Sequence, residues 1–345
     1  MPSQPQITDI AIIGAGPVGL FAVFECGMLG LGCHVIDSLS DIGGQCSALY
    51  PEKPIYDIPG YPVIEAGDLV ARLREQAAPF APIFHLGETA DALARGADSR
   101  WRLTTSHGTV IDAAAIMIAA GTGAFGFNRP PLDGIESYEG TGVFYMVARR
   151  EAFRDQRLVI AGGGDSAVDW ALSLAEIAAH VTMVHRRPKF RAAPESVAKL
   201  EALVAAGGVE LAIPYQLAGL EGDGTRLDAV RLTSLDGEER RVPADALLAF
   251  FGLAATLGPI ADWGLAIENN LVRVDPATCE TTVNGIYAIG DVADYAGKLK
   301  LILTGFAEAA MAAHAAYPRA RPDQALHFEY STTKGLPTNS GSDRP

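Results

Sequence analysis

The sequence lacks what several protein classes require. Its four cysteines, Cys26, Cys33, Cys46 and Cys279, form no C-x-x-C pair, so we expect neither a disulfide framework nor a metal site. No uninterrupted apolar run reaches about 18 residues, so no membrane span is expected. No basic segment precedes an apolar stretch at the start, so we expect no secretory signal and a cytoplasmic protein.

Positive charge is also scarce. The chain has 27 Lys and Arg against 41 Asp and Glu, a net charge of −14, so we expect no nucleic-acid partner. Apolar residues make up 49% and charged residues 20%, which is typical of an ordered globular chain. The length of 345 residues is enough for two domains with sizeable cores.

Glycine is plentiful, with 37 residues, and two glycine clusters repeat one motif. The run Ile10–Ile13 leads into Gly14-Ala15-Gly16-Pro17-Val18-Gly19, and the run Leu158–Ala161 leads into Gly162-Gly163-Gly164-Asp165-Ser166-Ala167. Each reads as a strand, a glycine turn and the start of a helix, which is the dinucleotide-binding arrangement. The first glycine makes the tight turn, the second lets a pyrophosphate approach, and the third allows the helix to pack closely.

The two copies differ where the second strand ends. Asp37 stands in the first copy at the place that His185 takes in the second, where Arg186, Arg187 and nearby Arg191 follow. A carboxylate at that place accepts hydrogen bonds from a ribose diol, whereas arginines favour a 2′-phosphate. The chain is therefore predicted to hold two different dinucleotides, the second being NADP(H), and to transfer electrons between them.

The pattern of strands and helices predicts an α/β fold with two Rossmann-like dinucleotide-binding domains. The first domain is discontinuous, over 1–120 and 250–345, and the second is inserted over 121–249. We expect strands over 7–13, 33–36, 115–120, 181–184 and 285–291, a small antiparallel meander over 88–113, and helices over 19–30, 66–78, 166–179, 194–206 and 299–316. The segment 38–63 is predicted to be a long irregular loop.

Two further places bear on the chemistry. Asp291 ends the apolar run 285–291, where its carboxylate can accept a bond from a ribityl hydroxyl of FAD, and the following helix is predicted to begin close by. Cys46 has Pro51 five positions later, where glutathione-reductase-like enzymes carry a second cysteine. The segment 145–148 holds no cysteine where thioredoxin reductases place a pair. Cys46 is therefore interpreted as a packed residue.

With these motifs the chain resembles the ferredoxin–NADP reductases of the thioredoxin-reductase-like type, over nearly its whole length. The motifs shared with thioredoxin reductases are GGGDSA at 162–167, HRRPKFRA at 185–192 and GIYAIGD at 285–291. The missing cysteines and the tail beyond the last helix point to the reductases of ferredoxin. The resemblance implies FAD in the first domain, NADP(H) in the second, and a homodimer.

The resemblance also implies roles for single residues. For FAD the implied set is Gly14, Gly16, Pro17, Gly19, Asp37, Gly44, Gln45, Tyr50, Ala90, Phe125, Asp291 and Thr332. For NADPH the implied set is Gly162, Gly164, Asp165, Ser166, Ala167, Arg186, Arg187 and Arg191. Tyr50 would stack on one face of the flavin, and Tyr330 of the tail would cover the other face across the dimer. No side chain is expected to act as acid, base or nucleophile.

The predicted function is an FAD-dependent oxidoreductase that moves electrons between NADPH and ferredoxin or flavodoxin. A hydride would pass to flavin N5, and single electrons would follow. An enzyme reducing an external disulfide protein or a quinone, and a non-catalytic module that senses FAD and NADP, remain open. Acidic ferredoxins would need a local basic patch, with two candidate groups: Arg149, Arg150, Arg154 and Arg157, or Lys298 and Lys300.

Overall fold

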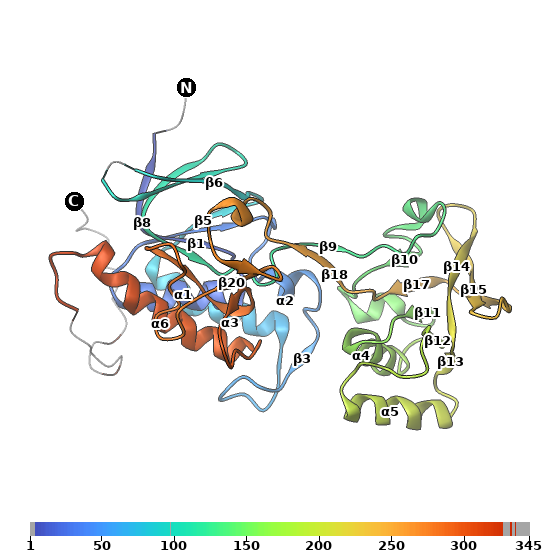
Figure 1. Cartoon of the computed structure of the whole chain (residues 1–345). Coiled ribbons are helices and arrows are strands. Elements are labelled where there is room, and N and C mark those ends of the chain that lie inside the picture. The colour runs from blue at the N-terminus through green and yellow to red at the C-terminus, as the bar shows by residue number, and fades with distance from the viewer. Residues whose placement is uncertain (1–3, 97, 327–331, 333–334, 336–345) are drawn as a thin grey trace. The chain divides into compact units, whose positions relative to one another are not determined.

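The computed structural model describes residues 4–96, 98–326, 332 and 335. It divides into two compact units: unit 1 contains Met1–Phe125 and Ala255–Pro345, and unit 2 contains Gly126–Ala254 (Figure 1). The sequence placed these boundaries a few residues earlier, after 120 and after 249. Strands β9 (Ala124–Phe127) and β18 (Leu253–Thr256), which carry the chain between the units, pair with each other.

Unit 1 is built on a seven-stranded sheet. In spatial order its strands are β5 (Ile83–Leu86), β2 (Cys33–Asp37), β1 (Gln6–Ile13), β8 (Val110–Ile118), β7 (Trp101–Thr105) and β6 (Ala90–Arg95), with β21 (Ile286–Ala288) beside the second half of β8. Strands β5, β2, β1, β8 and β21 are parallel, and β6 and β7 are antiparallel. The carboxyl ends of the parallel strands therefore share one edge, where ligands bind in folds of this kind.

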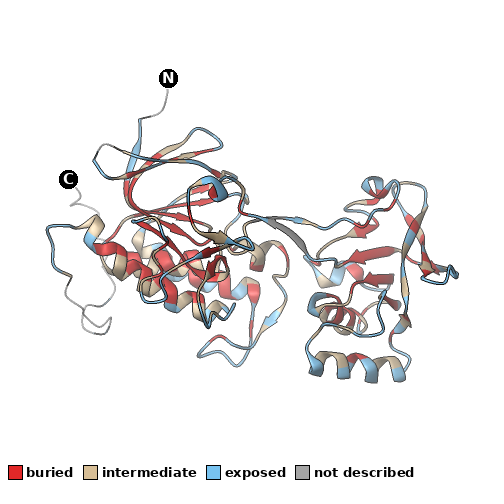
Figure 2. Ribbon diagram, in the orientation of Figure 1, coloured by how far each residue is buried: buried red, intermediate tan, exposed pale blue. Residues whose placement is uncertain are grey.

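Alternation along β1 sends side chains to two cores. Ile10 and Ile12 face helices α1 (Pro17–Met28) and α6 (Ile302–Ala320), whereas Ala11 and Ile13 face Leu103 and Ile260 on the other side. The buried stripe of α6 has helical spacing and consists mostly of small residues, among them Ala309, Ala312, Ala313 and Ala316. In Figure 2 the buried residues of this unit gather in the central strands and on the inner sides of these helices.

Smaller elements complete unit 1. They are α2 (Gly44–Ala48), β3 (Pro54–Ile55), β4 (Ile64–Glu65), α3 (Ala66–Ala77), β19 (Ile267–Glu268), β20 (Leu271–Arg273), β22 (Ala293–Asp294), and the 3₁₀ helices η1 (Ala78–Phe80), η4 (Gly258–Asp262) and η5 (Gly290–Val292). Strands β3 and β4 pair in one small sheet, and β19, β20 and β22 form a second one.

Unit 2 repeats the parallel arrangement. Its sheet follows the order β10 (Val143–Phe144), β17 (Ala246–Ala249), β11 (Arg157–Ala161), β12 (His180–Val184) and β13 (Glu210–Ala212), all parallel. One side packs on α4 (Asp165–Leu174) and α5 (Pro194–Ala205). The other side packs on an antiparallel sheet of β14 (Tyr215–Gly222), β15 (Leu227–Ser234) and β16 (Glu239–Pro243), with η2 (Ile135–Tyr138) nearby; η3 (Arg150–Phe153) precedes β11.

Four expectations from the sequence need correction. The strand expected over 115–120 is the second half of β8, which continues unbroken from the meander. The helix expected over 166–179 ends at Leu174, because the N–H of Ala179 and the carbonyl of Ile177 bond instead to the segment 155–156. The strand expected over 285–291 stops at Ala288 and turns into η5. The loop 38–63 contains α2 and β3.

The helices of the described residues include none with the length and apolar character needed to cross a membrane. Within the same residues, no cluster of three or more His, Cys, Asp or Glu side chains is placed to hold a metal ion. The four cysteines are free and buried.

Candidate functional site

The first glycine turn is fixed by close backbone contacts. Gly14 has φ +112°, and a Cβ there would lie 2.3 Å from the carbonyl oxygen of Ala119, which follows β8. A Cβ on Gly19 would lie 1.9 Å from the Gly14 carbonyl oxygen. At Gly16 the nearest atom to a Cβ is 4.0 Å away, so the missing side chain leaves open space there. With Pro17 at its first position, α1 points its amino end at this space, as an anion-binding turn requires.

Asp37, at the end of β2, faces the same space. Its carboxylate is 9% exposed and accepts the N–H of Ala15 at 2.7 Å and the N–H of Leu39 at 2.9 Å. Burial raises the pKa of Asp37, and the two backbone hydrogen bonds lower it by a smaller amount. A carboxylate has about four acceptor positions, so both oxygens retain capacity for a ribose diol.

A cleft runs along the carboxyl edge of the unit 1 sheet. It is lined by residues drawn from 13–18, 36–50, 88–90, 119–123 and 257–260, together with Gly290, Asp291 and Ile302. A cleft lined by a strand-end acid and a glycine turn fits the adenosine and pyrophosphate of a dinucleotide such as FAD.

Part of the cleft wall is formed by α2 and by Tyr50, which follows it. Gly44 has φ +55°, and a Cβ there would come within 3.1 Å of the Gly16 Cα, so α2 lies directly against the glycine turn. The Gln45 amide donates a hydrogen bond to the hydroxyl of Thr122 at 2.9 Å, which fixes its side chain in the cleft wall. Burial raises the pKa of the Tyr50 hydroxyl, which also lies in this wall, so Tyr50 is a neutral aromatic surface.

Cys46 is the one cysteine of the four that lines the cleft, and its surroundings keep it a thiol. It is 3% exposed, and burial raises its pKa to about 11. Nucleophilic and redox-active cysteines need a lowered pKa, so the chemistry of Cys46 agrees with its interpretation as a packed residue.

The glycine turn of unit 2 is covered by the loop that carries the arginines. A Cβ on Gly162 would lie 2.7 Å from the carbonyl oxygen of Phe250. The N–H of Arg191 donates to the Gly163 carbonyl at 2.7 Å, and the N–H of Ala193 donates to the Asp165 carboxylate at 2.8 Å. These bonds hold the loop after β12 beside the amino end of α4.

The guanidinium groups of this loop are available to a ligand. Arg186, Arg187 and Arg191 are exposed, and none has an acidic partner among the described residues. Several other arginines of unit 2 are paired, for example Arg157 with Asp245 at 2.6 Å. Burial lowers the pKa of His185, and the charges of the three arginines lower it further, so positive charge converges here. Unpaired guanidinium groups beside a helix start are suited to a phosphate.

Comparison with known proteins assigns the chain to a family. Residues 8–318 match the family described as pyridine nucleotide-disulphide oxidoreductase. The ferredoxin–NADP reductase of Rhodospirillum rubrum (strain ATCC 11170) is 62% identical over 338 residues, covering 97% of this chain and 98% of that protein. The ferredoxin–NADP reductase of Paramagnetospirillum magneticum (strain AMB-1) is 62% identical over 330 residues, covering 96% and 98%. The chain belongs to the ferredoxin–NADP reductases.

Solved structures agree with the fold expected of this family. The thioredoxin reductase of T. acidophilum has a TM-score of 0.77 at 22% identity, covering 90% of this chain and 98% of that one. The thioredoxin reductase of Lactococcus lactis has a TM-score of 0.76 at 24% identity, covering 91% and 99%. The predicted α/β fold of the thioredoxin-reductase-like type is thus confirmed.

The structure brings most of the predicted flavin residues of this reductase together. The predicted residues that line the cleft are Gly14, Gly16, Pro17, Asp37, Gly44, Gln45, Tyr50, Ala90 and Asp291. Gly19 lies behind them in α1. Thr332 is exposed, Tyr330 lies outside the described residues, and so does the side chain of Phe125, whose backbone is in β9.

Sequence reasoning about this reductase missed several wall residues. Ala119, Ala120 and Gly121 follow β8, and their place at the end of a buried parallel strand was a usable signal. Residues Leu257–Ile260, at the start of η4, return to the cleft only after unit 2, so local sequence gave no signal for them.

The predicted docking cations of the reductase need one clear correction. The side chain of Lys298 is 4% exposed and forms an ion pair with Glu308, so it is not available to a partner protein. Arg150, Arg154 and Arg157 are engaged with Glu176, Glu151 and Asp245. Arg149 and Lys300 are exposed.

Proposed function

We propose that this reductase transfers electrons between NADPH and ferredoxin or flavodoxin, with FAD held in the cleft of unit 1. One contrast carries the proposal: equivalent strand ends hold the Asp37 carboxylate in unit 1 and unpaired arginines in unit 2. The names of the relatives, which are ferredoxin–NADP reductases at 62% identity over almost the full length, support the choice of acceptor.

The residues fit the two cofactors. Asp37 would accept the adenosine ribose of FAD, the start of α1 would face its pyrophosphate, and Asp291 would accept from its ribityl chain. The glycine turn before α4 would hold the NADPH pyrophosphate, with Arg186, Arg187 and Arg191 on the 2′-phosphate. When bound, FAD accepts two electrons from NADPH and can release them singly.

The side chains of the cleft would hold FAD and cover its flavin ring. Asp37 and Gln45 have their orientations fixed by hydrogen bonds within the chain, so they would bind without large rearrangement. Tyr50 stays neutral because burial raises its pKa, which suits an aromatic ring that covers an apolar ligand surface. The raised pKa of Cys46 argues against a thiol relay through the cleft.

The quaternary state and setting are part of the proposal. A homodimer, with Tyr330 and Thr332 reaching the partner's cofactor, rests on the family resemblance. Four free cysteines are usual in a reducing compartment, which supports the cytoplasm. Sedimentation velocity of the purified chain tests the dimer, and a monomer at micromolar concentration contradicts it.

Anaerobic stopped-flow spectroscopy tests the function. The FAD-loaded chain is mixed with NADPH, and then with ferredoxin, flavodoxin, thioredoxin or a soluble quinone. We expect rapid bleaching of flavin absorbance by NADPH and its return with ferredoxin or flavodoxin. Return only with thioredoxin or the quinone would identify a reductase of another acceptor. No return with any acceptor would identify a redox-sensing module. A chain that binds no FAD refutes the proposal.

A further inference from the structure

One acidic side chain in unit 1 is almost completely buried. Glu308 of α6 is 2% exposed, and its carboxylate accepts three donors. These are the N–H of Gly290 at 2.7 Å, the hydroxyl of Tyr295 at 2.7 Å and the ammonium of Lys298. A carboxylate is stable at such a place only when a cation balances its charge and donors bind its oxygens, and Lys298, Tyr295 and Gly290 supply both here.

All three donors belong to one segment that starts and ends in the cleft. Gly290 and Asp291 line the cleft at the start of this segment, and Ile302 lines it at the end, where α6 begins. Tyr295 and Lys298 lie between. Glu308 therefore ties down the start and the middle of the segment from within the helix that follows it.

The packing around this turn leaves little freedom. Gly305 precedes Glu308 by about one helical turn, and a Cβ there would lie 2.4 Å from Val18 and 3.3 Å from the Gly290 Cα. Val18 belongs to α1 and lines the cleft. The Gly290 turn is thus held between α1 and α6, and any shift of Glu308 moves the backbone that presents Asp291.

We propose that Glu308 is a positioning residue for the flavin: it fixes Asp291 and the start of α6 in the geometry that binds FAD. The proposal rests on the proposed flavin site. Glu308 also balances the charge of Lys298, so that no uncompensated ammonium is left buried behind the cleft. Glu308 itself does not line the cleft.

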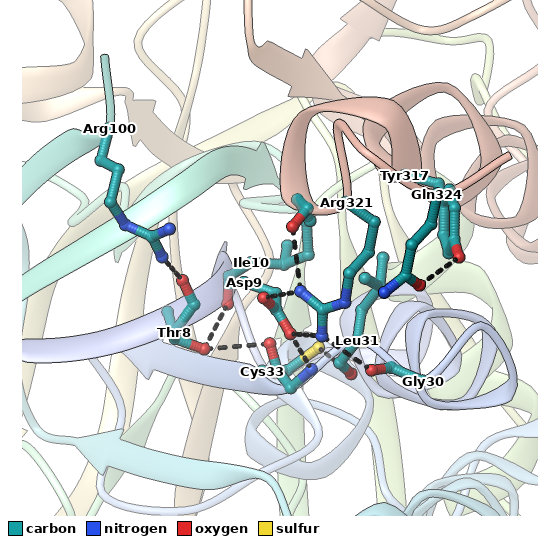
Figure 3. Close-up of polar contacts among 12 residues, drawn as sticks. Thr8, Asp9, Ile10, Gly30, Leu31, Cys33, Arg100, Tyr317, Arg321 and Gln324 are labelled. Carbon is teal, nitrogen blue, oxygen red and sulfur yellow. Dashed lines mark hydrogen bonds and ion pairs between the residues drawn. The ribbon is translucent and has the colours of Figure 1, made fainter. Parts of the chain in front are cut away.

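The opposite end of α6 offers a matched control. Arg321 follows Ala320, the last residue of α6, and its guanidinium binds the Asp9 carboxylate at 2.5 and 2.8 Å (Figure 3). The N–H of Gly32 donates to the same carboxylate. This is again a carboxylate held by a cation and a backbone N–H against the same helix. Neither Asp9 nor Arg321 lines the cleft.

The experiment compares three variants: Glu308→Gln, the double variant Glu308→Gln with Lys298→Met, and Arg321→Gln. FAD is titrated into each apo-protein, its dissociation constant is read from the flavin fluorescence, and the melting temperature of each apo-protein is recorded. In Glu308→Gln the new amide N–H₂ must face a donor, so we expect FAD affinity to fall by about tenfold or more. The double variant removes the facing ammonium and is expected to return to within about threefold of the unaltered chain.

Arg321→Gln is expected to lower the melting temperature while FAD affinity stays within about twofold of the unaltered chain. Unchanged FAD affinity in Glu308→Gln, or an equal loss in Arg321→Gln, overturns the proposal. Should Glu308→Gln fail to fold, Tyr295→Phe removes one donor and keeps the ion pair. A loss of FAD affinity there supports the proposal, and no loss overturns it. If the unaltered chain binds no FAD, the proposed function is refuted as well. If the unaltered chain binds FAD and substitution of Glu308 leaves the FAD affinity unchanged, this inference alone is refuted.

Discussion

The arginine loop of unit 2 gives the sharpest prediction about cofactor choice. We expect the double variant Arg186→Ala/Arg187→Ala to lose activity with NADPH while keeping its activity with NADH. Both guanidinium groups are exposed and have no acidic partner among the described residues, so their removal leaves no buried charge or unpaired carboxylate behind. The loss therefore reports ligand contacts and not a damaged fold.

The magnitude follows from the exposure of these groups. A hydrogen bond to a charged group contributes about 1.5–3 kcal/mol, and solvent screening favours the lower end here. Two such contacts contribute about 3 kcal/mol, which corresponds to a fall of roughly 100-fold in kcat/KM for NADPH. Because exposed charges are screened over about 8 Å at physiological ionic strength, the preference of the unaltered chain for NADPH should also narrow as salt is added.

The assay is steady-state reduction of ferricyanide with NADPH and with NADH, using the FAD-loaded chain. Arg149→Ala is the matched control, since it removes an exposed arginine of the same unit. The neighbouring Arg150 contacts Ser173 and Glu176, near the carboxyl end of α4 and so at the opposite end of that helix from the glycine turn. Arg149→Ala should leave both values of kcat/KM unchanged. Equal losses with NADPH and NADH in the double variant would show that these arginines do not bind the 2′-phosphate.

Three further predictions test the structure. Cys46→Ser should keep most of the turnover of the unaltered chain. Iodoacetamide should not inactivate the unaltered chain, because a pKa of about 11 leaves roughly 10⁻⁴ of the Cys46 thiol ionised at neutral pH. Rapid inactivation by iodoacetamide would contradict this. Gly14→Ala should lower the free energy of unfolding in urea by about 2–4 kcal/mol, because φ is +112° there and the new Cβ would meet the Ala119 carbonyl. Gly16→Ala should leave the apo-protein as stable as the unaltered chain and weaken only FAD binding. Equal losses of stability in the two variants would contradict the different roles of the two glycines. Burial lowers the pKa of His34 to about 4, and His85 lies 2.9 Å away, so the unfolded chain takes up a proton at a higher pH than the folded chain does and stability is lost as pH falls from about 6.5 toward 4. By pH 5 the free energy of unfolding in urea should have fallen by about 2 kcal/mol, and His34→Gln should remove this loss. An unchanged pH profile in that variant would rule out His34 as the source.

The glycine turns and the regular strands and helices could be predicted from local sequence, because backbone conformation and side-chain spacing determine them. Both glycine turns could be predicted, because the positive φ at Gly14 and the close approach at Gly19 demand glycine whatever surrounds them. The alternation in β1 and the helical spacing in α6 were equally readable. The predicted start of α1 was two residues late, because Pro17 supplies the first helical position.

The ends of helices α4 and α6 and the burial of Lys298 depend on tertiary contacts that local sequence does not show. The helix expected to end at 316 continues to Ala320 through Pro318, since Tyr317 packs in the core and Arg321 binds Asp9 just beyond. The helix α4 ends at Leu174, and just beyond it the carbonyl of Ile177 and the N–H of Ala179 bond to the backbone at 155–156. Lys298 looked like a surface cation because its partner, Glu308, is ten residues away on a helix whose other residues are mostly apolar. A single acid in an alanine-rich helix gave no sign of being buried.

The core of unit 1 determines when during synthesis this unit can be completed. Strand β1 and helix α1, drawn in blue in Figure 1, share that core with α6, drawn in red, so the first-made and last-made elements need each other. Unit 2 is one continuous stretch and can close on itself during synthesis. The amino-terminal part of unit 1 is therefore expected to keep an apolar sheet face uncovered until the final helix has been translated, and we expect chaperone binding to be strongest in this interval.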